Sequence, residues 1–340
     1  MDKHQLMLDA FIENVQKNYQ EDVGMVIVYG SYVTHTMNEL SDVDIMFVGK
    51  TKRAFDLQKQ FIYEGIGYDF FCMPIERVHK IVESYSPLIS IIAEGKLLYA
   101  DSLEKTSHFK ALQTRLNQLP SLEPVTKYFS EIEKVMKTLK VLAFDHQFAS
   151  FEKKIHIQGQ MIYQAMHYLQ LLNRKHYKYG IKKMMEEIQS MELKPKTIIY
   201  YLELLQKQSV STLEIMTFVN TLEEFYQDIK KANQTAFDKD ELNGFYEEES
   251  SVWNKLINAA THDDLTTAFL AATSIENELS HFRKFIPSIP SIFAGYQSSV
   301  TTLLESSKTT EVAMLNQIKE WKVDIRSYKT IEDVITYLKA

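Results

Sequence analysis

The chain has 340 residues with a formal net charge of -7 at pH 7, and its composition of 45% hydrophobic and 24% charged residues is ordinary for a globular protein. A surface that holds a nucleic-acid backbone needs an excess of Lys and Arg, so the acidic balance disfavours a nucleic-acid partner. The single cysteine, Cys72, excludes an internal disulfide framework. Because no stretch approaches the roughly 18 to 20 apolar residues of a membrane span and the N-terminus lacks a secretory signal, we expect no membrane partner and a cytoplasmic location.

The first hundred residues alternate between helix and strand patterns. Leu6, Phe11 and Val15 recur at helical spacing and predict an opening helix. The later segments are expected to be strands at 24–30 and 43–49, a helix at 53–65, a strand at 66–74, a helix at 75–85, and a helix, a glycine turn and a short strand over 86–101. We therefore expect an α+β fold with a small mixed sheet over residues 1–104.

The remainder of the chain has a different pattern. Apolar residues recur there at intervals of three and four, with few glycines and no alternation, which predicts helices. Pro120 and Pro124 mark the change of character. We expect an all-α bundle over 105–340, either as one domain or as two subdomains, 105–235 and 250–340.

Asp42 and Asp44 are placed unusually, because they alternate with apolar residues in a segment that otherwise reads as a buried strand. Residues two apart in a strand point to the same face, so both carboxylates are expected side by side while Val43 and Ile45 turn to the core. Two anions this close repel each other unless a cation lies between them or one is protonated. Magnesium ions fit such a pair, because Mg²⁺ favours oxygen ligands and usually binds one or two carboxylates together with substrate phosphates.

Two further features accompany this pair. Gly30 ends the preceding strand, where it allows a close backbone approach, and Ser31 offers a hydroxyl and an amide at an expected helix N-terminus, which suits a phosphate. Asp69 lies in a neighbouring apolar run, so the three acids converge if its strand pairs with the strand of Asp44. Each feature alone is more often a turn or a solvated edge, and only their combination points to a site.

A Gly-Ser pair at a strand end, followed by Asp-apolar-Asp-apolar and by a single acid on a later strand, resembles the nucleotidyltransferase superfamily that includes DNA polymerase beta. The resemblance covers roughly residues 20–100. With a helical C-terminal half, the chain looks most similar to antibiotic nucleotidyltransferases of the kanamycin and lincosamide types. The resemblance implies transfer of a nucleoside monophosphate from a nucleoside triphosphate, by default AMP from ATP, to a hydroxyl group with release of pyrophosphate.

The same resemblance implies roles for individual residues. Asp42, Asp44 and Asp69 would bind two Mg²⁺ ions, and Asp69 would also accept the proton of the acceptor hydroxyl. Gly30 and Ser31 would bind the nucleotide phosphates. Apart from the resemblance, Lys178 of the helical half is a candidate phosphate ligand because of its charge, and a solvated helix face is the alternative explanation. The sequence does not decide whether Lys182 and Lys183 also bind phosphate. It also does not decide whether Glu131, Glu133 or Glu186 acts as the base in place of Asp69.

The expected acceptor is a small hydroxyl-bearing molecule, such as a cationic aminoglycoside drawn to an acidic cleft. A homodimer is compatible with this interpretation. The alternatives are a polymerase or transfer-RNA end-adding enzyme, which would need a basic track, and an antitoxin-like or protein-modifying module that acts through a protein partner.

Overall fold

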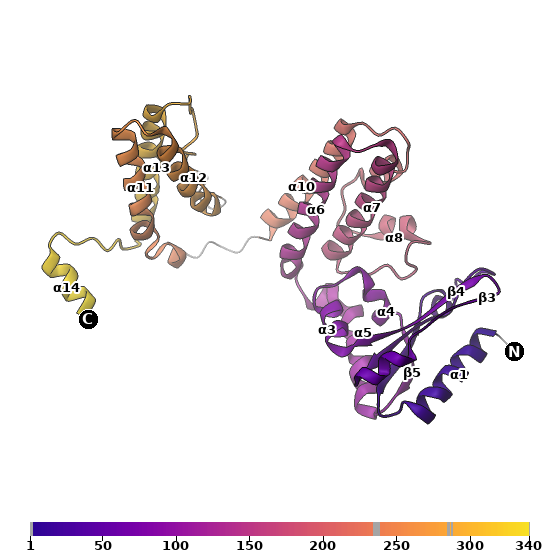
Figure 1. Ribbon diagram of the computed structural model, residues 1–340. Coiled ribbons are helices and arrows are strands. Elements are labelled where there is room, and N and C mark those ends of the chain that lie inside the picture. The colour runs from indigo at the N-terminus through magenta and orange to yellow at the C-terminus, as the bar shows by residue number, and fades with distance from the viewer. Residues whose placement is uncertain (1–2, 234–238, 284–285, 287, 340) are drawn as a thin grey trace. The chain divides into compact units, whose positions relative to one another are not determined.

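The computed structural model describes residues 3–233, 239–283, 286 and 288–339 (Figure 1). Its contacts divide the chain into two compact units, Met1–Gln234 and Thr235–Ala340. The boundary after residue 104 that the sequence predicts falls inside the first unit and stays a prediction. No helix among the described residues is both long and apolar enough to cross a membrane.

The first unit contains a mixed sheet of five strands in the order β3-β4-β2-β1-β5. The strands are β1 (Val23–Tyr29), β2 (Asp44–Gly49), β3 (Lys59–Tyr63), β4 (Ile66–Pro74) and β5 (Lys96–Ala100). The central strand β2 pairs antiparallel with β1 and parallel with β4, while β5 and β3 are antiparallel edge strands. This mixed sheet and the helices that follow it confirm the expected α+β fold class.

The two faces of the sheet belong to different cores. Met25, Met46 and Met73 share a core with helices of the same unit, whereas Val26, Phe47 and Phe70 pack on the other face. Helix α1 (Lys3–Asn18) covers this second face through Phe11, among other residues (Figure 1). Because side chains alternate along a strand, Asp44 belongs to the face of Met46 and therefore points toward the helical side.

One sequence prediction was wrong. The segment 53–65 was expected to be a helix, but it forms a 3₁₀ helix, Lys52–Leu57, followed by strand β3. Glu64 and Gly65 both have positive φ, 50° and 76°, which is the backbone of a tight hairpin turn between β3 and β4. Phe61 of β3 stacks on Tyr68 of β4 with ring centroids 5.1 Å apart, so cross-strand pairing prevails over the helical spacing of the apolar residues.

The other helices of the first unit, apart from α2 (Ser31–Thr34), belong to the core of the opposite face, that of Met25, Met46 and Met73, and extend beyond it. They are α2 (Ser31–Thr34), α3 (Ile75–Glu83), α4 (Ser90–Ala93), α5 (Leu103–Leu122), α6 (Phe129–Phe148), α7 (Phe151–Asn173), α8 (Met184–Ser190), α9 (Ile198–Leu204) and α10 (Thr212–Ala232), with 3₁₀ turns at Pro87–Ile89 and Val125–Tyr128. Helix α5 runs through Pro120, so the change of character that the prolines marked follows the end of this helix. A continuous core joins Met46 in the sheet to Leu139 in α6 and Leu222 in α10.

The second unit contains a 3₁₀ turn at Lys239–Leu242 and the helices α11 (Phe245–Thr261), α12 (Leu265–Phe282), α13 (Val300–Glu320) and α14 (Ile331–Lys339). Trp253, Ile275 and Leu303 contribute one side chain each from α11, α12 and α13 to a separate core. The sequence predicted helices throughout this region, and Asp264 caps the start of α12 by accepting a hydrogen bond from the amide of Thr267 at 3.0 Å.

Candidate active site

The strand ends of β1 and β2 bring an acid, a tyrosine and a glycine together. Tyr29 is the register partner of Asp44 in the antiparallel pair, so both side chains lie on the same face of the sheet. The next residue, Gly30, has φ 72° and lies against the Asp44 carboxylate: a Cβ atom on Gly30 would be 2.2 Å from Asp44 Oδ2. Glycine is therefore required at this position both by its backbone conformation and by the space that the carboxylate occupies.

The parallel pairing of β2 and β4 adds a second carboxylate. Ile45 is the register partner of Phe70, so one residue earlier Asp44 is adjacent to Asp69 on the same face. Asp42 precedes β2 by two residues and is half-buried, while Asp69 is exposed and accepts a hydrogen bond from Gln60 at 3.3 Å. The sheet topology thus gathers the predicted acids at one end of β2.

The electrostatic effects of Asp42 and Asp69 on Asp44 agree with the proximity of the three carboxylates. Burial, followed by the charges of Asp42 and Asp69, raises the pKa of Asp44 to about 6. Burial, followed by the charges of Asp44, Asp69 and Asp42, also raises the pKa of the Tyr29 phenol. The charges of Asp42 and Asp69 therefore both act on Asp44, which the register places on the same face of the sheet.

Ser31 begins the short helix α2 directly after Gly30. The carbonyl oxygen of Gly30 accepts hydrogen bonds from the amides of Val33 and Thr34, at 3.2 and 3.1 Å, which turns the chain away from the strand. Ser31 itself is half-buried. The predicted Gly-Ser pair therefore borders the acidic group through the contact of Gly30 with Asp44.

A loop of the helical half, between α7 and α8, reaches the acids. Lys182 lowers the pKa of Asp44 and so opposes the effect of its acidic neighbours. Its ammonium group donates a hydrogen bond to the carbonyl oxygen of Thr36 at 3.2 Å, in the segment that joins α2 to β2. Lys182 is thus a basic residue of the helical half that interacts electrostatically with Asp44.

Lys178, the lysine that the sequence favoured as a nucleotide ligand, contacts a different acid. Its ammonium group lies 3.7 Å from Glu94 Oε2, and Glu94 Oε1 is 2.8 Å from the imidazole Nε2 of His176. The hydrogen bond from His176 lowers the pKa of Glu94. These contacts attach the loop to the end of α4, and the role of Lys178 as a phosphate ligand stays a prediction.

The acids left open as an alternative base lie on helices of the bundle. Glu131 is paired with Lys134 at 2.6 Å, both on α6. Glu133 accepts hydrogen bonds from Tyr226 and Lys230 of α10. Glu186 is exposed in the first turn of α8. The contacts of Glu131 and Glu133 are therefore with the helical half.

The donor set suits a hard cation. All of its charged donors are carboxylate oxygens, and a cation beside Asp44 would relieve the repulsion that raises its pKa. Within the described part of the chain, no group of three or more His, Cys, Asp or Glu residues forms a ready-made metal site. Mg²⁺ needs no such cage, since it commonly takes one or two carboxylates and completes its shell with water and phosphate oxygens.

Sequence reasoning passed over two residues of this group. Tyr29 was treated only as part of a strand, although its place at the end of β1 is visible in the sequence as the residue before Gly30. Lys182 was one of three candidate lysines, and Lys178 was preferred. No sequence pattern shows which lysine of a loop acts on an acid 138 positions earlier in the chain. Only the tertiary structure shows that both residues act on or pair with Asp44.

Residues 11–104 match the family described as polymerase beta, nucleotidyltransferase. The N-terminal domain belongs to the polymerase beta nucleotidyltransferase superfamily. The matched region includes Gly30, Ser31 and the three aspartates, and it confirms the superfamily that the motif resembles. It does not include Lys178 or Lys182.

Two known proteins are similar to this chain. A curated protein of Methanocaldococcus jannaschii named "Putative protein adenylyltransferase" is 28% identical over 136 residues, which cover 37% of this chain and 85% of that protein. The crystal structure of a nucleotidyltransferase-like protein from Exiguobacterium sibiricum 255-15 superposes with a TM-score of 0.41 at 11% identity, over 66% of this chain and 76% of the other.

Proposed function

We propose that this nucleotidyltransferase moves AMP from ATP to a hydroxyl group of an acceptor, and that Asp42, Asp44 and Asp69 form its catalytic group. The observation that carries the proposal is the junction of β1, β2 and β4, where the register brings Asp44 beside Tyr29 and Asp69 while Gly30 makes room for the Asp44 carboxylate. The superfamily match over the same residues supports it.

The reaction is a displacement at the α-phosphorus of the triphosphate. The acceptor oxygen forms a bond to this phosphorus while the bond to the bridging oxygen of the β-phosphate breaks, and pyrophosphate leaves. The proton of the acceptor hydroxyl passes to a carboxylate oxygen of Asp69, which is exposed and so available to a bound acceptor. The Ser31 hydroxyl and amide, with the Lys182 ammonium group, hold the phosphates that depart.

Asp42, Asp44 and Asp69 would also hold Mg²⁺. Mg²⁺ bound there supplies charge neutralisation for the carboxylates and the triphosphate, and polarises the phosphoryl oxygens. The contribution of the protein is to fix the carboxylates on one rigid sheet end before the substrate arrives, which is the arrangement that makes electrostatic stabilisation effective.

For the acceptor, the name of the Methanocaldococcus jannaschii relative favours a protein hydroxyl over the small molecule expected from the sequence. A small molecule is the second candidate. It is supported by a hollow of about 530 Å³ beside α2, lined by Tyr32, Val33, His35, Met37 and Lys96, which is large enough for a drug-sized acceptor.

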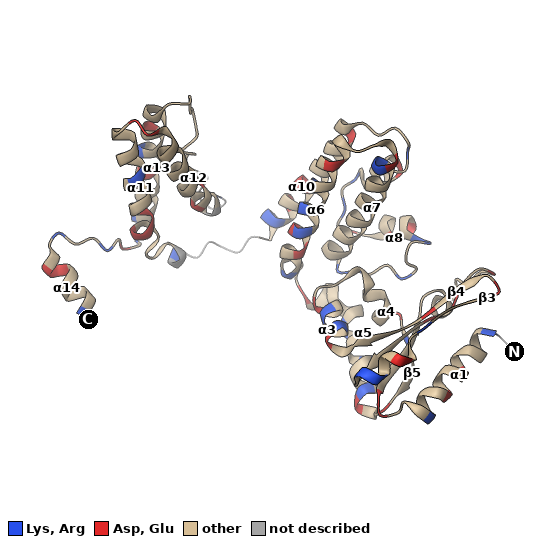
Figure 2. Cartoon of the chain, in the orientation of Figure 1, with Lys and Arg blue, Asp and Glu red and all other residues tan. Residues whose placement is uncertain are grey.

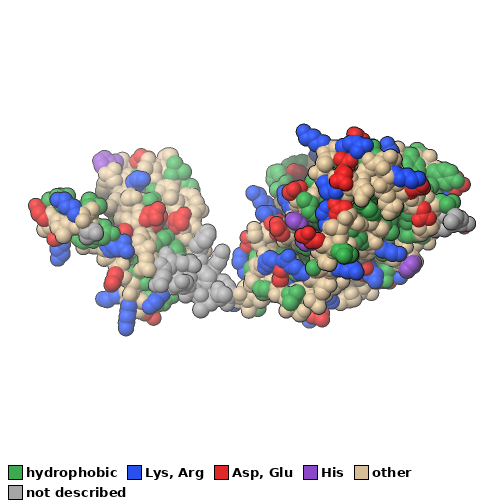
Figure 3. All heavy atoms as spheres, turned by 90° about the horizontal axis from the view of Figure 1, so that it is seen from below, with side chains coloured by type: hydrophobic (Ala, Val, Ile, Leu, Met, Phe, Trp, Pro, Cys, Tyr) green, Lys and Arg blue, Asp and Glu red, His purple; other side chains and the backbone are tan. Residues whose placement is uncertain are grey.

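A nucleic acid is not the favoured acceptor. Figure 2 shows Lys and Arg mixed with Asp and Glu along α6 and α10. Several of these charges pair across the two helices, including Lys140 with Glu223 at 3.0 Å. The face of the first unit in view in Figure 3 likewise mixes both signs of charge with hydrophobic side chains. A polynucleotide track would instead present a continuous basic stripe.

The test supplies ATP labelled at its α-phosphate, Mg²⁺ and a cell extract that keeps its small molecules, with labelled acid-insoluble protein and labelled small products other than ATP counted separately. A protein acceptor puts the label into the insoluble fraction, and a small acceptor leaves it in solution with an equal amount of pyrophosphate. An Asp44→Asn variant is the matched control and should give neither. If the wild-type protein releases no more pyrophosphate than this variant with any of the four triphosphates, the proposal is wrong.

A further inference from the structure

A second cavity lies at the opposite end of the same sheet. It has a volume of about 820 Å³ and is lined by the start of β1, the end of β2 and the first turns of α3 and α5. Gly24 and Met25 at the start of β1 line the cavity. The candidate active site lies at the other end of this strand, where Tyr29 is in register with Asp44. Small-molecule pockets typically occupy roughly 300–1,000 Å³, so the cavity has the size of a ligand site. The proposed reaction does not use it.

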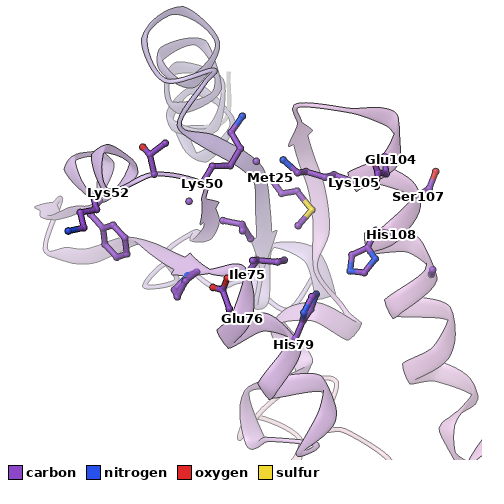
Figure 4. A pocket seen from close by; sticks show the side chains of 17 residues that line it. Met25, Lys50, Lys52, Ile75, Glu76, His79, Glu104, Lys105, Ser107 and His108 are labelled. Atoms are coloured by element: carbon purple, nitrogen blue, oxygen red, sulfur yellow. The ribbon is translucent and has the colours of Figure 1, made fainter.

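The walls of the cavity combine apolar and imidazole surfaces. Met25, Phe55 and Ile75 supply apolar area from the sheet, the 3₁₀ segment and α3. His79 of α3 and His108 of α5 face each other from separate helices, with ring centroids 5.6 Å apart (Figure 4). An apolar or aromatic ring between these walls would be in contact on more than one side.

One end of the cavity is rich in ammonium groups. Lys50 and Lys105 both bind the same oxygen, Oδ2 of Asp101, at 2.8 and 2.6 Å, so two positive charges face one negative charge. Lys52 of the 3₁₀ segment, two residues after Lys50, also lines the cavity and is exposed, and no ion pair to it occurs among the described residues. The surplus of positive charge here favours an anionic group on the ligand.

Two acids limit where the anion can lie. Glu76 and Glu104 line the cavity from the first turns of α3 and α5. They would repel a ligand anion from the helical wall and accept hydrogen bonds from N–H or O–H groups. The anionic group is therefore directed to the end that carries Lys50 and Lys52.

From this arrangement we infer that the cavity binds a small organic anion, in which a ring system with an N–H or O–H donor carries one anionic group. The anionic group lies at Lys50 and Lys52, and the ring lies between Met25, Ile75 and the histidine pair. The site is separate from the proposed active site and does not depend on it, since the two lie at opposite ends of β1 and β2.

The probe for this chemistry is 8-anilinonaphthalene-1-sulfonate, which joins aromatic rings and an N–H group to one sulfonate. The control compound is N-phenyl-1-naphthylamine, which has the same rings and N–H group but lacks the sulfonate. Fluorescence titration of the full chain should show saturable binding of the sulfonate at one site and weaker binding of the uncharged amine. If the amine binds as tightly, the inferred anion site is wrong.

Three substitutions test whether the sulfonate probe binds in this cavity. Ala111 is exposed on α5 and lines the cavity, so Ala111→Trp should fill it and abolish the saturable site while circular dichroism stays unchanged. Lys52→Gln should weaken binding about three- to fivefold at low salt, in line with an exposed charge. Lys80→Gln is the matched control, because Lys80 is exposed on α3 but does not line the cavity, and it should change nothing.

A second readout is specific to the site. The C2 proton signals of His79 and His108, identified by their loss in His79→Gln and His108→Gln, should shift when the sulfonate is added. The same shifts should occur in Asp44→Asn, because the cavity is distinct from the acidic group. Saturable binding that persists in Ala111→Trp, histidine signals that do not move, or binding lost only in Asp44→Asn would each overturn the inference.

Discussion

Gly30 leaves the space that the carboxylate of Asp44 occupies. A Cβ atom at position 30 would approach Asp44 Oδ2 to 2.2 Å, far inside van der Waals contact, and the φ of 72° at Gly30 already disfavours any side chain. A glycine that sequence analysis associates with phosphate approach is therefore needed first for the position of an acid. The Gly-Ser pair and the aspartates form one structural unit rather than two independent motifs.

Gly30→Ala should displace the Asp44 carboxylate and lower nucleotidyl transfer by at least about 10²-fold, because catalysis depends on the placement of charge. Gly65→Ala is the matched control: Gly65 has a similar φ of 76°, but nothing lies within 4 Å of the added Cβ. It should destabilise the fold by about 1–2 kcal/mol through backbone strain and leave the rate unchanged. Pyrophosphate release and thermal unfolding measure both; equal loss of activity in the two variants would refute the steric explanation.

Asp44→Asn should abolish activity and yet stabilise the metal-free protein above pH 6. The pKa of Asp44 is raised from 3.8 to about 6, so the folded state holds this proton more tightly than the unfolded state does. The stability from that proton is fully present below pH 3.8 and is lost as the pH rises through about 6. The variant should therefore match the wild type near pH 4 and exceed it by about 1–3 kcal/mol at pH 7 to 8. Urea unfolding at several pH values in EDTA tests this, and a constant difference across the range would contradict it.

Mg²⁺ should stabilise the wild-type protein and not the Asp44→Asn variant. A ligand that binds only the folded state adds about 2.7 kcal/mol at a concentration 100-fold above its Kd. Removal of the ion with EDTA should reverse the shift in Tm. The control cation is Na⁺ at equal ionic strength, since screening alone also weakens the repulsion among the aspartates. An identical Mg²⁺ response in both proteins would exclude Asp44 as a ligand.

Lys182→Gln should raise the KM for ATP about three- to tenfold, because it removes a charge near the triphosphate. It should also raise the pKa of Asp44 further, since Lys182 is the group that lowers it. Lys183→Gln is the neighbouring control, as Lys183 lies over the ring of Tyr179 at 4.9 Å instead. Lys178→Gln tests the lysine that the sequence favoured. A rise in KM for Lys178→Gln alone would reverse the assignment of Lys182 as the phosphate ligand.

Much of the candidate active site could be predicted from local sequence patterns. The strand of Asp44 could be recognised because apolar residues alternate with the acids, and the helix α3 and strand β5 because Pro74 and Gly95 punctuate them. Strand β3 could not be recognised, because Ala54, Leu57 and Phe61 recur at helical spacing, and the pairing of Phe61 with Tyr68 becomes visible only in the sheet. Edge strands depend on such partners more than on their own propensity.

The sequence by itself determined the superfamily, the order of the elements through β5 apart from β3, and the identity of the candidate acids, because these depend on residue types and short-range spacing. The tertiary structure decided which residues meet: the parallel register of β2 and β4 that sets Asp69 beside Asp44, the contact of Gly30 with Asp44, and the choice of Lys182 over its neighbours. The physical reason is that charge interaction and steric exclusion act through distance in space. Spacing along the chain fixes this distance within a helix or strand but not between elements joined by loops.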